Sequence, residues 1–284
     1  MASFSCFNVD VTDGVAHIVM KRGDEFNTMT PSFWHELPEI IHALEAKAEA
    51  RVIVISSTGK HFTAGMDLGV FNSDDGLMAA DGPDDQNIGQ RREALRRLVA
   101  ELQNTFTILD DVRMPVLVAV QGGCLGGGID LISATDIRYC TRDAFFCIQE
   151  INLGMTADVG TFPRLCHLIP QGWVREMAYT GMRLGAEKAK EIGLVNEIYD
   201  TQAEMIEAVL ATAREIAAKA PLAVSGSKVM INYARDHSIR DGLDYIATWQ
   251  AGMFQPADMR EGMAAMQEKR TPVYRDLKAT KKAP

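Results

Sequence analysis

A glycine-rich segment, Gly122–Asp130, follows directly on a short apolar run and ends in an acidic side chain. Five of its first seven residues are glycine. Glycine loses more conformational entropy than other residues on folding, so this density indicates close backbone approach or unusual dihedral angles. A helix beginning here would present free N–H groups and partial positive charge, suited to a phosphate or a developing oxyanion. The alternative is a turn that serves only tight helix–sheet packing.

The two familiar phosphate-binding glycine motifs do not fit this segment. Starting from Gly126, the dinucleotide pattern G-x-G-x-x-G would need a glycine at position 131, where Leu131 stands. The Walker pattern fails as well, because no Gly-Lys-Ser/Thr follows. The segment therefore predicts neither a dinucleotide site nor a P-loop.

A second strand-to-loop transition lies at Lys60–Leu68, which follows an apolar run and contains the small pair Ala64-Gly65. Taken alone, it is typical of an ordinary loop. Together with the glycine-rich segment, however, it would place one backbone donor after each of two parallel strands. Two such donors form a cradle for a single oxygen atom.

Three carboxylates, Asp130, Glu150 and Asp158, stand among apolar and glycine residues in this half of the chain. Acids in such surroundings are expected to feel desolvation and one another's charge, which moves their pKa values apart. Paired acid and base catalysis requires such a separation. The alternative for each acid taken singly is a helix cap or an ion pair with an arginine.

Other chemistries are less favoured by the sequence. The six histidines form no HxxxH or HExxH pair, so we expect no metal site, and no G-x-S-x-G elbow is present. His61 is expected to be structural. Cys124 is a conceivable nucleophile, but a small packed side chain is the favoured interpretation because no histidine lies near it in sequence. No metal or redox cofactor is predicted.

The composition limits the partners and the compartment. With 284 residues, 47% of them hydrophobic and 24% charged, the chain is typical of a globular protein of one large domain, or of one domain with a helical appendage. The formal charge of -9 disfavours nucleic acid as a partner. Five irregularly spaced cysteines indicate reduced thiols. No targeting signal and no apolar run of about 18 residues is visible, so we expect a cytoplasmic protein that does not span a membrane.

Strands alternating with helices must position these segments. A Thr30-Pro31 helix start precedes an apolar stripe, and a clear amphipathic helix is expected over Arg91–Leu109. The acidic stretch Asn72–Gln90 predicts a loop. The alternation predicts a mainly parallel α/β sheet as far as about residue 170, and nearly all helix from residue 203 onward.

We therefore expect a core domain over residues 1–200 and a helical region over 201–284. The expected strands are Val15–Met20, Val52–Ile55, Val116–Val120 and Ile137–Cys140.

The combination of KHFTAGMDL, GGCLGGGID and DAFFCIQEINLGMTADVGTFPRL resembles the enoyl-CoA hydratase/isomerase (crotonase) superfamily. The similarity runs over roughly residues 10–270, and the stretch 116–165 is similar to the Δ3,5-Δ2,4-dienoyl-CoA isomerase branch in particular. The resemblance implies a crotonase-like core, a spiral of ββα repeats, with a C-terminal helical region for oligomerisation. It also implies homotrimers or homohexamers and an acyl-CoA thioester as substrate, with coenzyme A as part of that substrate.

The resemblance also implies roles for particular residues. The backbone N–H groups of Met66 and Gly127 would hold the thioester oxygen, and the first two family acids fall on Asp130 and Glu150. The acid that the isomerase branch adds falls on Asp158. The segment Ala64–Leu68, which is Ala64, Gly65, Met66, Asp67 and Leu68, would border the thioester and the adenine of coenzyme A.

These correspondences predict an isomerase that moves the double bonds of a 3,5-dienoyl-CoA to the 2,4 positions, an auxiliary step of fatty acid β-oxidation. Simple hydratases typically carry glutamate at the first two acid positions and an apolar or glycine residue at the third. An aspartate at position 130 and an acid at position 158 therefore favour the isomerase. The alternatives are a 2-enoyl-CoA hydratase that uses Asp130 and Glu150 around a water, and a non-catalytic acyl-CoA-binding scaffold.

Overall fold

A six-stranded sheet forms the centre of the protein, for which a computed structural model describes residues 4–70 and 87–280. The first pair of strands is antiparallel and all other neighbours in this sheet are parallel. The mainly parallel sheet expected from the sequence is thus confirmed. In spatial order the strands are β1 (Phe7–Thr12), β2 (Val15–Met20), β3 (Val52–Ser57), β4 (Val116–Val120), β6 (Ile137–Thr141) and β9 (Glu197–Tyr199).

Both faces of this sheet are covered, which is why β3 and β4 are apolar without alternation. Successive side chains of a strand point to opposite faces. Val52 and Val54 pack with helix α7 (Gln202–Ala217) on one face, whereas Ile53 and Ile55 join the larger core on the other. That larger core includes side chains of α1 (Pro31–Lys47) and α2 (Ile88–Asp111).

A small second sheet continues from the end of β4 and carries the glycine-rich segment. It consists of β5 (Gly123–Leu125), β7 (Phe145–Cys147) and β8 (Leu184–Gly185). Gly122 makes the turn between β4 and β5 with φ +55°, and a Cβ there would lie 2.2 Å from the carbonyl oxygen of Lys60. Only glycine fits this turn, which therefore brings the loops that follow β3 and β4 into contact.

Short helices carry Asp130 and Glu150, whereas Asp158 lies in the loop over residues 154–160. Helix α3 (Gly127–Ser133) begins within the glycine-rich segment, and the 3-10 helix η3 (Gln149–Leu153) follows β7. Helix α4 (Thr161–Leu168) comes next, followed by α5 (Gln171–Thr180) and α6 (Ala186–Glu191).

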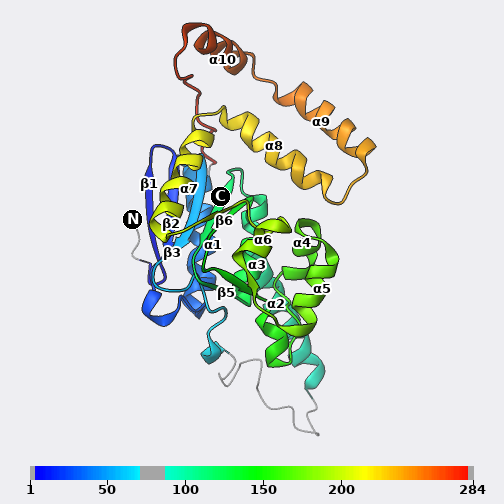
Figure 1. The fold of residues 1–284 in the computed structure, drawn as a ribbon. Coiled ribbons are helices and arrows are strands. Elements are labelled where there is room, and N and C mark those ends of the chain that lie inside the picture. The colour runs from blue at the N-terminus through cyan, green and yellow to red at the C-terminus, as the bar shows by residue number, and fades with distance from the viewer. Residues whose placement is uncertain (1–3, 71–86, 281–284) are drawn as a thin grey trace.

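Three C-terminal helices extend away from this body (Figure 1). They are α8 (Pro221–Ala234), α9 (Ile239–Met253) and α10 (Pro256–Glu268). Buried Lys228 ties α8 to the body, because its Nζ donates to the carbonyl oxygen of Leu109 at 2.6 Å and pairs with Asp136 at 3.0 Å. Helix α7 comes after residue 200 in the chain yet packs on the sheet, whereas α8–α10 project from it. The division of the chain into two regions at residue 200 stays a prediction.

The strands and the two helices expected from periodicity are present with small differences in their ends. Helix α2 begins at Ile88, three residues before the expected start, and β3 extends two residues further than expected. Most of the acidic stretch that predicted a loop lies outside the described residues. The outer strand β1 and the short strands β5, β7, β8 and β9 were not predicted.

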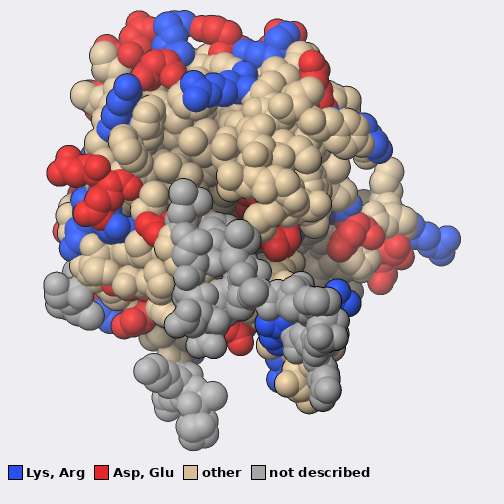
Figure 2. Space-filling model, turned by 90° about the horizontal axis from the view of Figure 1, so that it is seen from below, with Lys and Arg blue, Asp and Glu red and all other residues tan. Residues whose placement is uncertain are grey.

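The charged side chains form no extended patch of one sign on the face shown in Figure 2. Acidic and basic side chains are interspersed there around a broad uncharged area. Among the described helices, none is both long and apolar enough to cross a bilayer.

Candidate active site

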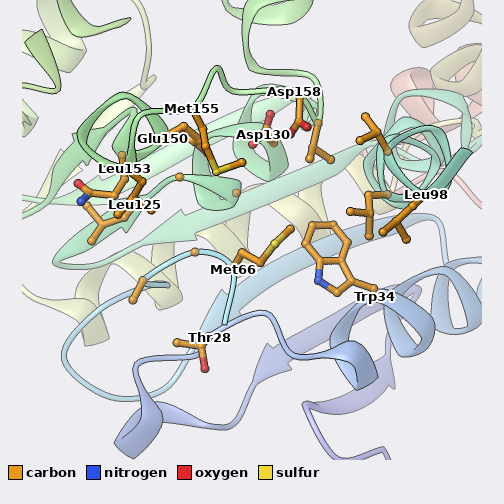
Figure 3. A pocket seen from close by; sticks show the side chains of 18 of the residues that line it. Thr28, Trp34, Met66, Leu98, Leu125, Asp130, Glu150, Leu153, Met155 and Asp158 are labelled. Atoms are coloured by element: carbon orange, nitrogen blue, oxygen red, sulfur yellow. The ribbon is translucent and has the colours of Figure 1, made fainter. Parts of the chain in front are cut away.

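A cavity of about 390 Å³ lies where the loop after β3 meets the start of α3. Residues Ala64–Met66 of that loop and Gly126 and Gly127 of the glycine-rich segment line it. The three acids line one side, and an apolar wall made of Trp34, Leu98, Val99 and Leu102 lines another. In Figure 3, Met66 and Trp34 lie across the cavity from Asp130, Glu150 and Asp158.

The two loops meet closely at Gly65. This residue has φ +87°, and a Cβ there would lie 2.8 Å from the carbonyl oxygen of Leu125 and 3.5 Å from the amide nitrogen of Gly127. Backbone hydrogen bonds fix the contact: the N–H of Leu125 donates to the carbonyl oxygen of Thr63 at 3.1 Å, and the N–H of Thr63 donates to that of Gly123 at 3.2 Å. The loops are therefore held in one fixed relative position.

This contact leaves two amides available to the cavity. Within the described part of the chain, no acceptor is hydrogen-bonded to the N–H of Met66 or of Gly127, and both residues line the cavity. Gly127 is also the first residue of α3, whose N-terminal N–H groups have no partner within the helix. Two preorganised donors at one site can stabilise an oxyanion.

Asp130 on α3 is almost completely buried, with 1% exposure. Its Oδ1 accepts hydrogen bonds from the N–H and the hydroxyl of Thr161, at 2.6 and 2.8 Å, while its Oδ2 is buried without a partner. Desolvation raises the pKa of Asp130 to about 6, although the bonds from Thr161 act in the opposite direction.

Glu150 on η3 is the second acid and is partly buried. A Cβ on Gly126 would lie 3.1 Å from its Oε1, so the carboxyl group stands directly beside the segment that carries the Gly127 amide. Its Oε2 is buried without a hydrogen-bond partner. Desolvation, and after it the charge of Asp130, raises the pKa of Glu150 to about 7. A carboxylate with this pKa is a useful base near neutral pH.

Asp158 is the most accessible of the three acids. The residue as a whole is exposed, yet it lines the cavity, and its side chain lies near Asp130 at the end toward Leu98 (Figure 3). Partial desolvation raises the pKa of Asp158 above its ordinary value. The three carboxyl groups thus line one cavity in the order Glu150, Asp130, Asp158.

Comparison with known proteins agrees with this arrangement. The Enoyl-CoA hydratase/isomerase family profile matches residues 10–278. The chain belongs to the enoyl-CoA hydratase/isomerase family. It is 41% identical to the mitochondrial Delta(3,5)-Delta(2,4)-dienoyl-CoA isomerase of Mus musculus over 90% of this chain and 77% of that protein. It is 36% identical to the peroxisomal Delta(3,5)-Delta(2,4)-dienoyl-CoA isomerase of Arabidopsis thaliana over 93% of each chain.

Solved structures confirm the crotonase-like fold. Enoyl-CoA hydratase from Bacillus anthracis superposes with a TM-score of 0.83 and 29% identity, covering 95% of this chain and 99% of its own. DspI from Pseudomonas aeruginosa gives a TM-score of 0.84 at 28% identity, covering 97% and 98%.

Only some of the predicted substrate-binding residues line the cavity. Ala64, Gly65, Met66 and Gly127 line it. Asp67 does not, because its carboxylate accepts from the hydroxyl of Thr28 and the N–H of Gly69. The side chain of Leu68 lies outside the described residues. The binding roles of these residues stay predictions.

Two further residues of the cavity region were not identified from the sequence. Thr161 bonds to Asp130 from 31 positions away, and no local pattern marks it. Arg183 lines the cavity with its guanidinium 4.6 Å from the centre of the Phe145 ring. A cation that lines a cavity in an acidic protein suits an anionic ligand, but only the fold places it there.

Cys124 and His61, which the sequence predicts to be structural, differ in burial. Cys124 is fully buried, and desolvation raises the pKa of its thiol well above the ordinary value. His61 accepts the N–H of Gly123 at its Nδ1, at 2.9 Å, and so supports the glycine turn. The described residues contain no group of three or more His, Cys, Asp or Glu that could hold a metal ion.

Proposed function

We propose that this protein is a Δ3,5-Δ2,4-dienoyl-CoA isomerase. The observation that carries the proposal is the third carboxyl group: Asp158 lines the same cavity as Asp130 and Glu150, beside the free amides of Met66 and Gly127. A hydration would need only two acids around a water. Acids spread along the cavity can instead act at two separated carbons of one conjugated chain.

The amides of Met66 and Gly127 hold the thioester carbonyl oxygen in this proposal. Loss of a proton from the substrate delocalises negative charge onto that oxygen and forms a dienolate. Donors already fixed in a cavity stabilise such charge without reorganisation, and loss of one donor typically lowers the rate about 10²–10³-fold. The fixed contact at Gly65 would keep both donors in place.

The order of the acids along the cavity supports one assignment of the proton transfers. Glu150 stands beside Gly126, next to the amide that would hold the thioester oxygen, so it removes a proton from C2. Asp158 stands toward the apolar wall and delivers a proton to C6. The C2–H bond breaks, the double bonds move from C3 and C5 to C2 and C4, and the C6–H bond forms. Glu150 ends protonated and Asp158 ionised.

Asp130 assists without transferring a proton to carbon. Its ionised form raises the pKa of Glu150 and thereby makes Glu150 a stronger base. Its free Oδ2 is buried at the cavity between the two other acids. The proposed steps involve only proton transfer, so we propose that no metal or redox cofactor takes part and that coenzyme A enters as part of the substrate.

Substitution of the two proton-transfer acids tests the assignment. We expect Glu150→Gln and Asp158→Asn each to lower kcat for a 3,5-dienoyl-CoA by about 10²–10⁴-fold, the usual contribution of a positioned acid or base. Isomerisation is followed by ultraviolet absorbance, and Glu207→Gln, which changes an exposed acid on α7, is the control. Either active-site variant working at the wild-type rate would refute the assignment.

The alternatives are separated by the same assay. Hydration of crotonyl-CoA faster than isomerisation of dienoyl-CoA would identify a 2-enoyl-CoA hydratase that uses Asp130 and Glu150. Binding of acyl-CoA without turnover of any unsaturated thioester would identify a scaffold. The buried, unpartnered oxygens of Asp130 and Glu150 favour catalysis, because leaving such groups unsatisfied destabilises a protein that gains nothing chemically from them.

We further propose that the chain forms a homotrimer or homohexamer through α8–α10. None of the residues of α9 is buried, and exposed Ile239, Leu243 and Ile246 recur at helical spacing. Such an apolar stripe is typical of a surface covered by another chain. Light scattering should give three or six times the chain mass of 31.2 kDa.

The compartment and the other partners stay predictions. A cytoplasmic location, without nucleic acid or membrane as partner, is the expectation from the sequence, whereas the two relatives named above are called mitochondrial and peroxisomal. Cell fractionation followed by immunodetection would decide the location.

A further inference from the structure

The carboxylate of Asp130 is held from one side only. Both hydrogen bonds to it come from a single residue, Thr161, and both end on Oδ1. Oδ2 is buried and has no partner. Thr161 itself has 0% exposure, so no water competes for its hydroxyl at the protein surface. The two oxygens of one carboxylate are therefore used differently: one is anchored and the other is free toward the cavity.

The backbone before Thr161 is shaped for this contact. Gly160 has φ +133°, and a Cβ there would lie 1.8 Å from Nη1 of Arg164, so a side chain at this position would clash. This conformation begins α4 at Thr161, whose N–H is free of helical bonds and points at Asp130. The hydroxyl and amide of one residue thus converge on one oxygen.

We propose that Thr161 is a positioning residue that fixes Oδ1 of Asp130, directs Oδ2 into the cavity and keeps the carboxylate ionised. The inference rests on the proposed function only for its catalytic consequence. Thr161 does not line the cavity, so it acts through Asp130.

The other charges around Asp130 do not replace this role. Asp158 and Glu150 are acidic neighbours that oppose its ionisation, and the thiol of Cys124 is fully buried and neutral. Arg164 favours ionisation, but its guanidinium is hydrogen-bonded to Asp110 at 2.7 Å and does not bond to Asp130. Thr161 is the residue that directly contacts the charge within the described part of the chain.

Thr161→Val tests the proposal, because valine keeps the shape and the backbone N–H but removes the hydroxyl donor. Hydrogen bonds to a charged group are strong enough to move a pKa by about one unit or more. The form active in catalysis has both Asp130 and Glu150 ionised and Asp158 protonated. We therefore expect the acid limb of the kcat/KM profile to move up by about one pH unit, which lowers kcat/KM at pH 6 about tenfold. Thr161→Ser keeps the hydroxyl and should restore the wild-type profile.

A measurement without turnover separates this proposal from the proposed function. Infrared titration of protein labelled with ¹³C-carboxyl aspartate, assigned by difference against Asp130→Asn, reports the ionisation of Asp130 directly. The midpoint should rise in Thr161→Val and not in Thr161→Ser, even if the wild-type protein turns over no dienoyl-CoA. Should Thr161→Val fail to fold, Thr161→Ala must show the same rise. An unchanged midpoint, or an equal rise in Thr161→Ser, would overturn the proposal.

Discussion

Asp130 and Glu150 each present one buried, unpartnered carboxyl oxygen, and the charge on Asp130 raises the pKa of Glu150. The pair is therefore coupled: ionisation of one acid disfavours ionisation of the other. Desolvation is the largest cause of the upward shift for both. Burial of these carboxyl groups thus creates a base that titrates near neutral pH, whereas in water each group would already be ionised well below pH 7.

The first prediction concerns the pH dependence of activity. Because Glu150 has a pKa of about 7 and must be ionised to accept a proton, whereas Asp158 must be protonated to deliver one, kcat/KM should follow a bell-shaped pH profile. Its acid limb should lie near pH 7, and its basic limb should report the loss of the proton from Asp158. Asp130→Asn removes the neighbouring charge, so the acid limb should move to lower pH while the plateau rate falls, since Glu150 becomes a weaker base. A rate profile of Asp130→Asn with its acid limb unmoved would contradict the coupling.

The second prediction concerns stability. The folded-state pKa of Asp130 lies above the ordinary value of 3.8, so the folded protein binds more protons than the unfolded chain between about pH 4 and 6. The contribution of protonated Asp130 to the free energy of unfolding is therefore lost as pH rises through this window. Asn at this position can still accept both bonds from Thr161 and carries no charge. We expect Asp130→Asn to stabilise the protein at pH 7.5 by about 2–3 kcal/mol and hardly at pH 4.

Urea unfolding at fixed protein concentration measures this difference, because an oligomer's stability depends on concentration. Asp244→Asn, at an exposed position of α9, is the control and should leave the free energy of unfolding unchanged at both pH values. Equal stability of Asp130→Asn and wild type at pH 7.5 would show that burial of this charge is compensated elsewhere.

The elements that could be predicted from the sequence are those in which burial leaves a periodic pattern. The run Val116–Val120 is apolar at every position because helices cover both faces of the sheet, and its bounds were predicted correctly. Strands β5 and β8 were missed because three and two residues, rich in glycine, show no periodicity. Their pairing depends on the turn at Gly122, which is a tertiary feature.

The residues of the site also fall into two groups, those that the sequence could locate and those that only the fold brings to the cavity. The glycine-rich segment and the acids lie within 37 positions of one another, and the resemblance to known family motifs located them. The residues that complete the cavity lie far away in the chain: Trp34 on α1, Leu102 on α2 and Arg183 before β8. No spacing rule connects these positions, since only the packing of α1 and α2 against the larger core brings them together.

The third prediction concerns the contact between the two loops. Gly65→Ala would place a methyl group 2.8 Å from the carbonyl oxygen of Leu125, in a backbone conformation that side chains disfavour. The loop must move, and the amide of Met66 would move with it. We expect kcat for dienoyl-CoA to fall by about 10²-fold or more, as when an oxyanion donor is lost. Gly172→Ala is the matched control, because a Cβ there has no atom within 4 Å. A Gly65→Ala enzyme with full activity would show that the fixed contact is not required.

The last prediction concerns the apolar wall. Leu102 on α2 and Trp34 on α1 both line the cavity. The indole Nε1 of Trp34 donates to the carbonyl oxygen of Met29 at 3.2 Å and so holds the ring in place. An acyl chain that passes Asp158 must run along this wall. Leu102→Trp fills part of that space, so kcat/KM for a long-chain dienoyl-CoA should fall about tenfold or more relative to a short-chain one, because overpacking typically costs about 1–3 kcal/mol. Leu95→Trp, on the same helix but exposed and away from the cavity, should leave the ratio unchanged. If Leu102→Trp slows both substrates equally, the acyl chain takes another path.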